Sequence, residues 1–89
     1  MIRIKRVDYS KNFQKQLKKA PLKIKLAFKN RRDLFNQNPF SSQLNNHQLT
    51  GKFKGFRCIN ITGDWRAIFS ERGGVIIFVA LGTHSQLYK

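Results

Sequence analysis

Two histidines, an aspartate and an arginine are the residues of this chain whose types suit acid–base chemistry on a phosphate ester. They are His47, Asp64, Arg66 and His84. A histidine with a pKa of about 6.5 can accept or donate a proton near neutral pH, and an arginine can stabilise charge that grows on phosphoryl oxygens. Such a set suits RNA cleavage, because the attacking 2′-hydroxyl belongs to the substrate and the leaving 5′-oxygen needs only a proton.

Each of these residues also has a structural explanation that the sequence leaves open. Asp64 follows Gly63 and can simply form a turn. A histidine such as His84 can bond to backbone in a loop, His47 can lie on the surface, and Arg66 can be a cation on a sheet. Only the convergence of several of them in one place favours the catalytic interpretation, so the elements that position them decide the question.

Metal and thiol chemistry fit the sequence less well. The two histidines are far apart, and the single cysteine, Cys58, belongs to no closely spaced ligand pair. Gly73-Gly74 lacks the helix that follows a phosphate-binding loop. A nucleophilic pair of Cys58 with a histidine stays open, although nothing near Cys58 in the sequence would stabilise a thiolate. We therefore expect no metal ion and no cofactor.

Charge is the strongest compositional signal. The 89 residues include 18 Lys and Arg against 4 Asp and Glu, a formal net charge of +14. A small domain with this balance attracts polyanions, and nucleic acid is the first candidate. A basic surface can also serve solubility or docking to an acidic protein. The lone cysteine and the lack of a long apolar segment lead us to expect a cytoplasmic protein with no membrane contact.

Helical periodicity dominates the first half of the chain. Asp8 or Ser10 can cap a first helix, and Pro21 both ends that helix and suits the start of a second. Apolar residues recur at helical spacing in both: Tyr9, Phe13, Leu17 and Ala20 in the first helix, and Ile24, Ala27, Phe28, Leu34 and Phe35 in the second. The sequence predicts a second helix over residues 21–37, with basic residues on the outer faces of both.

Short apolar runs predict four strands. Residues 2–7 alternate apolar and basic side chains, and residues 75–81 are an unbroken apolar run, typical of a strand covered on both faces. Two further strands are expected over residues 53–62 and 65–71. Glycine-containing turns separate the last three strands, as in hairpins. Between helices and meander, residues 36–46 should form a loop from which Phe40 and Leu44 return to the core.

The predicted fold is therefore α+β, a single domain over residues 1–89 in the order β-α-α-β-β-β. Its antiparallel meander carries both helices on one face and leaves the other face comparatively open. A meander brings its strand ends together, so several polar residues should cluster there: Arg57, Asn60, Asp64, Arg66 and His84.

Two motifs give the chain a resemblance to a known family. GDWRAIF at residues 63–69 is followed by an apolar strand and GTHSQLY at residues 82–88. Their order and spacing in a short basic chain resemble the RelE/ParE superfamily of bacterial toxins, and within it the YafQ-like mRNA interferases. The resemblance extends over essentially the whole chain. It implies a toxin of a type II toxin–antitoxin system, an endoribonuclease that enters the ribosomal A site and cuts mRNA there.

The resemblance also implies roles for individual residues. His84 is the first candidate for general acid or base and His47 the second, with Asp64 orienting or assisting proton transfer. Arg66 matches a phosphate-stabilising arginine. Tyr88 matches an aromatic residue that packs against a base, a contact worth ~1–3 kcal/mol.

One position departs from the pattern of the YafQ-like toxins. Asn60 stands where these toxins often have a further histidine. An asparagine cannot transfer protons, but it can hydrogen-bond a phosphate or a ribose. We expect Asn60 to contact substrate in this way, together with four further residues: Lys52, Lys54, Arg57 and Trp65.

The implied partners are a cognate antitoxin, the ribosome and mRNA, with operator DNA bound only by the toxin–antitoxin complex. Two alternatives stay open on the same fold. One is a ParE-like toxin that acts on DNA gyrase and performs no RNA chemistry. The other is a plain nucleic-acid-binding module with little activity, which the asparagine at position 60 would favour.

Overall fold

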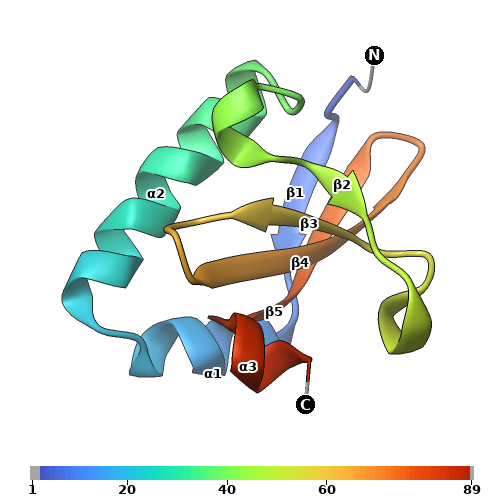
Figure 1. Ribbon diagram of the computed structural model, residues 1–89. Coiled ribbons are helices and arrows are strands. Elements are labelled where there is room, and N and C mark those ends of the chain that lie inside the picture. Colours follow the sequence, from blue (N-terminus) through green and yellow to red (C-terminus); the bar gives the residue numbers. More distant parts are fainter. Residues whose placement is uncertain (1–2, 89) are drawn as a thin grey trace.

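A five-stranded mixed sheet forms the centre of the molecule (Figure 1). The computed structural model describes residues 3–88. The strand order is β1-β5-β4-β3-β2, in which β1 runs parallel to β5 and the other neighbours are antiparallel. The strands are β1 (Arg6–Tyr9), β2 (His47–Gln48), β3 (Arg57–Asn60), β4 (Trp65–Arg72) and β5 (Val75–Thr83). The α+β prediction with an antiparallel meander is confirmed, with the short strand β2 as an addition.

The two long helices begin where the capping residue and the proline in the sequence predicted. Helix α1 (Lys11–Lys19) begins after Ser10, whose hydroxyl accepts a hydrogen bond from the Phe13 amide at 3.0 Å. Helix α2 (Leu22–Gln37) begins directly after Pro21. A third helix, α3 (His84–Leu87), was not predicted and ends the described chain. Within residues 3–88, no helix is long and apolar enough to cross a membrane.

The main core lies between these two helices and one face of the sheet. Phe13 of α1 and Phe28 and Phe35 of α2 are fully or almost fully buried, and they surround Phe78 of β5 with ring centroids 5.5–5.8 Å apart. These are residues of the predicted apolar stripes. Aromatic packing of this kind adds to simple burial of apolar surface. Figure 1 shows α1 and α2 along the lower and left sides of the sheet, with α3 in front.

The opposite face, predicted to be open, is partly covered. A second, smaller core lies there, formed by Leu49, Cys58, Ile68, Ala80 and Leu87. The segment between β2 and β3 and helix α3 supply its cover. The prediction that β5 is covered on both faces is wrong for its first half, where Ile77 is 36% exposed. A register shift between Ile68 and Phe69 separates the two halves of the β4–β5 pair.

Two predicted strands begin elsewhere. The strand expected at residues 2–7 is Arg6–Tyr9, because parallel pairing with Val75–Phe78 sets its position; Ile2 lies outside the described residues. The strand expected from residue 53 begins at Arg57, since Gly51–Phe53 form a 3₁₀ turn.

The predicted loop before the meander contains a 3₁₀ turn at Ser42–Leu44. Leu44 is buried, as predicted. Phe40 is 46% exposed, so its predicted return to the core is wrong. Its ring instead lies beneath the Arg57 guanidinium, 5.4 Å from ring centroid to guanidinium carbon.

Candidate active site

A cleft of about 260 Å³ lies on the sheet face opposite α1 and α2. Four of the predicted site residues line it: His47, Arg66, His84 and Tyr88. The other lining residues come from the strands and their connections: Gln48, Leu49, Thr50 and Cys58. His47 of β2 is paired with Cys58 of β3, and Arg66 of β4 lies on the same face as Ile68. Side chains from distant positions in the chain therefore meet in one place.

A backbone contact fixes the tautomer of the His47 ring. The His47 side chain is exposed, and its Nδ1 lies 2.7 Å from the carbonyl oxygen of Asn45. A carbonyl oxygen only accepts hydrogen bonds, so Nδ1 carries the proton. In the neutral ring Nε2 is then the acceptor. Asn45 has a left-handed backbone (φ 48°), which ends the preceding 3₁₀ turn and leads the chain into β2.

His84 is held by its backbone and by an aromatic neighbour. It is the first residue of α3, and its amide donates to the carbonyl oxygen of Asp64 at 3.1 Å. Its ring centroid is 4.7 Å from that of Tyr88. Thr83 and Gln86 form a reciprocal capping box that fixes the start of the helix. The imidazole itself is exposed and makes no hydrogen bond within residues 3–88.

Arg66 is anchored at one end of its guanidinium group. Nη1 donates to the carbonyl oxygens of Thr62, Gly63 and Trp65 at 3.1, 3.0 and 3.3 Å. Nε and Nη2 have no hydrogen-bond partner in the described chain. A half-buried cation fixed in this way can stabilise an anion without first reorganising.

Tyr88 and Cys58 form the apolar side of the cleft. The Tyr88 ring lies between the rings of His84 and Phe53, 5.8 Å from the latter. Burial raises the pKa of the Cys58 thiol above its ordinary value of 9.0, although the adjacent Tyr88 hydroxyl and the Arg66 charge oppose this effect. Cys58 is therefore a protonated thiol at neutral pH, which disfavours the pairing of a thiolate nucleophile with histidine.

This buried thiol leads to a prediction about stability. Because the pKa of Cys58 is raised in the folded state, its contribution to stability is fully present below about pH 9 and is lost as pH rises through the folded pKa. We expect the difference in free energy of unfolding between the wild type and Cys58→Ala to become smaller above pH 9. Urea denaturation of both proteins between pH 7 and pH 10.5 measures it. A difference that stays constant over this range would contradict the prediction.

Six predicted site residues do not line the cleft, and three of them lie on β3, on β4 or in the turn between these strands. Asp64 contributes its backbone carbonyl to His84, while its carboxylate makes no hydrogen bond or ion pair within residues 3–88. Trp65 points to the other face and packs against the main core, because neighbours on a strand alternate. Asn60 lies opposite Arg66 on β3, with a buried Oδ1 that lacks a hydrogen-bond partner in the described chain.

The remaining predicted residues lie beside the cleft. Lys54 and Arg57 line a larger neighbouring cavity, and Lys52 is exposed with its ammonium 5.2 Å from the centre of the Phe53 ring. Sequence reasoning missed Gln48 and Thr50, which line the cleft. The signal that could have found them is their closeness in sequence to His47: Gln48 is its neighbour on the short edge strand β2, and Thr50 follows that strand by two residues.

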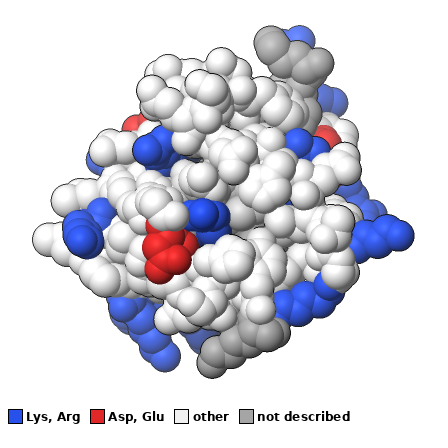
Figure 2. Space-filling view, viewed as in Figure 1, with Lys and Arg blue, Asp and Glu red and all other residues white. Residues whose placement is uncertain are grey.

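Charged side chains lie mainly around the edge of this face and less at its centre. Figure 2 views the molecule from the side of α3, and Lys and Arg lie there mainly along the left, lower and right-hand edges. The centre is largely uncharged, apart from a small group of basic and acidic atoms. No group of three or more His, Cys, Asp or Glu in residues 3–88 is placed to hold a metal ion. The distribution of basic side chains around the edge of this face suits contacts with a polyanion on either side of the cleft.

The comparison with protein families shows the family of the chain. Residues 5–89 match the family model described as "Bacterial toxin of type II toxin-antitoxin system, YafQ". The chain belongs to the YafQ family of type II toxins. The sequence-based resemblance to RelE/ParE toxins and their YafQ branch is thereby confirmed. No curated protein matches the chain.

Solved structures agree with this assignment. YafQ from E. coli strain BL21(DE3) is 25% identical with a TM-score of 0.80, over 93% of this chain and 97% of that one. YafQ in the E. coli DinJ–YafQ toxin–antitoxin complex is 25% identical with a TM-score of 0.79, over 99% and 100%. A YoeB/ParE toxin from Agrobacterium tumefaciens, 12% identical with a TM-score of 0.71 over 89% and 98%, shares the fold.

Proposed function

We propose that this YafQ family toxin is a ribosome-dependent endoribonuclease that cleaves mRNA by acid–base catalysis. The observation that carries the proposal is the cleft in which His47, His84 and Arg66 meet. These residues lie far apart in the sequence and supply two proton-transfer groups and one fixed cation. The reaction needs no metal, since the nucleophile is the substrate's own 2′-hydroxyl.

The hydrogen bonding of His47 suggests a division of roles. Nε2 of His47, the acceptor in the neutral ring, takes the proton of the 2′-hydroxyl. The 2′-oxygen bonds to phosphorus, the bond from phosphorus to the 5′-oxygen breaks, and His84 protonates that oxygen. Arg66 stabilises the charge on the phosphoryl oxygens. The products are a 2′,3′-cyclic phosphate and a 5′-hydroxyl end.

Other residues support this chemistry in different ways. Tyr88 packs against a base beside His84, and Lys52, Lys54 and Arg57 hold the flanking RNA. Asp64 acts as a positioning residue through its carbonyl contact with His84. Trp65, which the sequence led us to place at the substrate, packs against the main core instead, whereas Asn60 lies opposite Arg66 on the face of the sheet that carries the cleft.

We further propose that a cognate antitoxin binds this toxin and silences it, as the DinJ–YafQ complex of E. coli suggests. The charge of +14 favours an acidic partner segment. Binding of operator DNA is then a property of the toxin–antitoxin complex.

Mapping of mRNA 5′ ends after induction of the gene tests the proposed activity. We expect new ends within translated codons soon after induction. Intact mRNA together with DNA broken through gyrase would overturn the proposal in favour of a ParE-like toxin. Intact mRNA and intact DNA would leave only a nucleic-acid-binding module.

Free RNA should be a poor substrate. The cleft offers few side chains to hold the RNA, so the ribosome has to supply much of the alignment of the 2′-hydroxyl with the phosphate. We expect purified toxin to cut mRNA on translating ribosomes and to leave the same mRNA largely intact without them. Primer extension on both samples measures this. Equal cleavage without ribosomes, at catalytic protein concentration, would contradict the prediction.

A further inference from the structure

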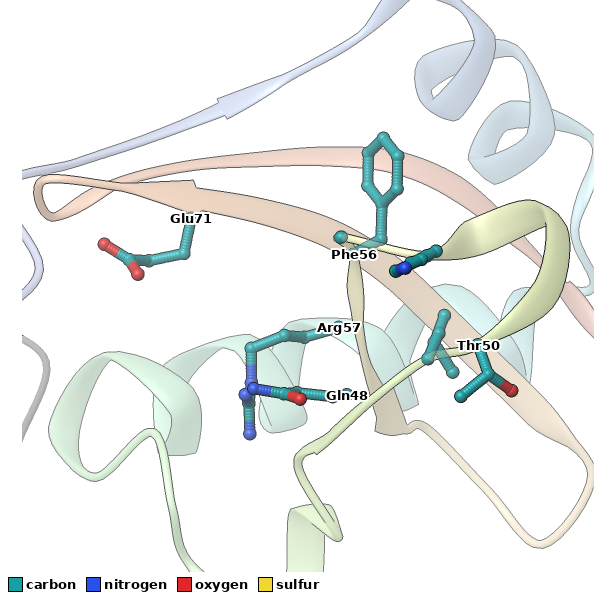
Figure 3. A pocket seen from close by; sticks show the side chains of 8 residues that line it. Gln48, Thr50, Phe56, Arg57 and Glu71 are labelled. Atoms are coloured by element: carbon teal, nitrogen blue, oxygen red, sulfur yellow. The ribbon is translucent and has the colours of Figure 1, made fainter.

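A second and larger cavity, the side pocket, adjoins the catalytic cleft. It measures about 680 Å³, within the usual range for small-molecule sites. It shares Gln48, Leu49 and Thr50 with the cleft, so only the segment from β2 to the next turn separates the two. Its remaining lining residues are Lys54, Gly55, Phe56, Arg57 and Glu71 (Figure 3).

Arg57 enters the side pocket in a fixed position. Its Nε donates to Asn46 Oδ1 at 2.8 Å, and its guanidinium lies over the Phe40 ring. In Figure 3 the side chain extends beside Gln48. The terminal nitrogens Nη1 and Nη2 make no hydrogen bond within residues 3–88. They form a planar donor pair of the kind that recognises two adjacent acceptors.

Glu71 is an unpaired acid in a strongly basic chain. Asp8 and Asp33 lie within ion-pair distance of neighbouring arginines, whereas Glu71, like Asp64, forms no ion pair among the described residues. Its Oε2 accepts from the Gly74 amide at 2.9 Å. Oε1 has no partner there and can accept from a ligand.

Arg57 and Glu71 lie on the same face of neighbouring strands. Arg57 of β3 is paired with Phe69 of β4, and Glu71 is two residues further along β4. Such diagonal neighbours are about 7–8 Å apart at their Cα atoms, within reach of long side chains. They nevertheless do not form an ion pair, because Asn46 and Phe40 hold one side chain and the Gly74 amide holds the other. Figure 3 shows the two side chains apart from each other, with Arg57 below Glu71 in the view.

We propose that the side pocket binds a nucleobase of the mRNA next to the cleaved bond and selects guanine. This inference rests on the proposed ribonuclease function. Guanine presents two adjacent N–H donors, N1 and N2, to a carboxylate and two acceptors, O6 and N7, to an arginine. No other base offers both pairs. Leu49 supplies apolar surface beside the base, and Lys54 provides a cation for the adjoining phosphate.

The first test compares cut sites of the wild type, Glu71→Gln and the control Asp33→Asn. Asp33 is exposed and lines neither cavity, so its substitution makes the same change of charge elsewhere. We expect the wild type and the control to favour guanine at one fixed position relative to the cut. Glu71→Gln should reduce that preference about tenfold, the scale of one lost bidentate contact. An unchanged guanine preference in a folded Glu71→Gln protein would overturn the proposal.

The second test needs neither ribosomes nor catalysis. The wild-type toxin is titrated with 5′-GMP, 5′-AMP, 5′-CMP and 5′-UMP, and amide chemical shifts are followed by NMR. We expect 5′-GMP to shift the amides of Gln48, Phe56 and Glu71 at the lowest concentration. Equal effects of all four nucleotides, or no shifts at these positions, would overturn the proposal. Guanine-selective shifts in a toxin that cuts no mRNA would support the pocket while refuting the ribonuclease function.

Discussion

Replacing His84 by alanine lowers the rate of mRNA cleavage by about 10²-fold or more, the scale expected for loss of one acid–base group. The imidazole lines the cleft and lies against Tyr88. Without it, the 5′-oxygen must leave as an unprotonated alkoxide or take its proton from water. The measurement is the single-turnover rate on programmed ribosomes, with growth arrest after induction as a second readout.

The fold should survive this change. The His84 side chain is exposed, and its amide can still donate to the Asp64 carbonyl in the variant. Circular dichroism and the melting temperature verify this. Ser85→Ala is a matched control, since Ser85 is the exposed neighbour on the same short helix and does not line the cleft. Wild-type cutting and growth arrest by His84→Ala would show that the role assigned to His84 is wrong.

Replacing Arg66 by alanine should cost ~2.7–4 kcal/mol of transition-state stabilisation, if its cation acts like a lost oxyanion-hole donor. This corresponds to a cleavage rate roughly 10²–10³-fold lower. Alanine removes the charge from the cleft and also the three contacts of Nη1 with turn carbonyls. The rate therefore has to be measured on protein whose folded fraction is known from denaturation.

A second substitution at the same position separates charge from geometry. Arg66→Lys keeps the cation but cannot bond the turn and present a planar pair of donors at once. We expect its rate to lie between those of Arg66→Ala and the wild type. Arg72→Ala serves as the control, because Arg72 is an exposed arginine of the same strand outside both cavities. Turnover of Arg66→Ala equal to that of the wild type on translating ribosomes would remove Arg66 from the site.

Local patterns in the sequence determined most of the architecture. The spacing of Phe13, Phe28 and Phe35 predicts the two helices and the face that each buries, because helical periodicity needs only near neighbours. Glycine turns predict the meander in the same way. The two C-terminal motifs indicated the toxin family, and the family model confirms it. Residue type and this resemblance were enough to predict four site residues that line the cleft: His47, Arg66, His84 and Tyr88.

Other features depend on pairing between distant segments. Three of them are the parallel partner of β1, the short strand β2 and the second core. They follow from the strand register and from the register shift near Phe69, and no local sequence pattern encodes either. Strand alternation could have shown that Trp65 and Arg66 point to opposite faces.

The sequence by itself thus determined the two long helices, the meander and the family to which this basic chain belongs. The tertiary structure alone decided which polar side chains share a cavity. It brought His47 to the cleft, left the Asp64 carboxylate outside it, and placed Arg57 and Glu71 together in the side pocket. The physical reason is that secondary structure arises from neighbours along the chain, whereas a site depends on which strand edges and turns the core packing brings together.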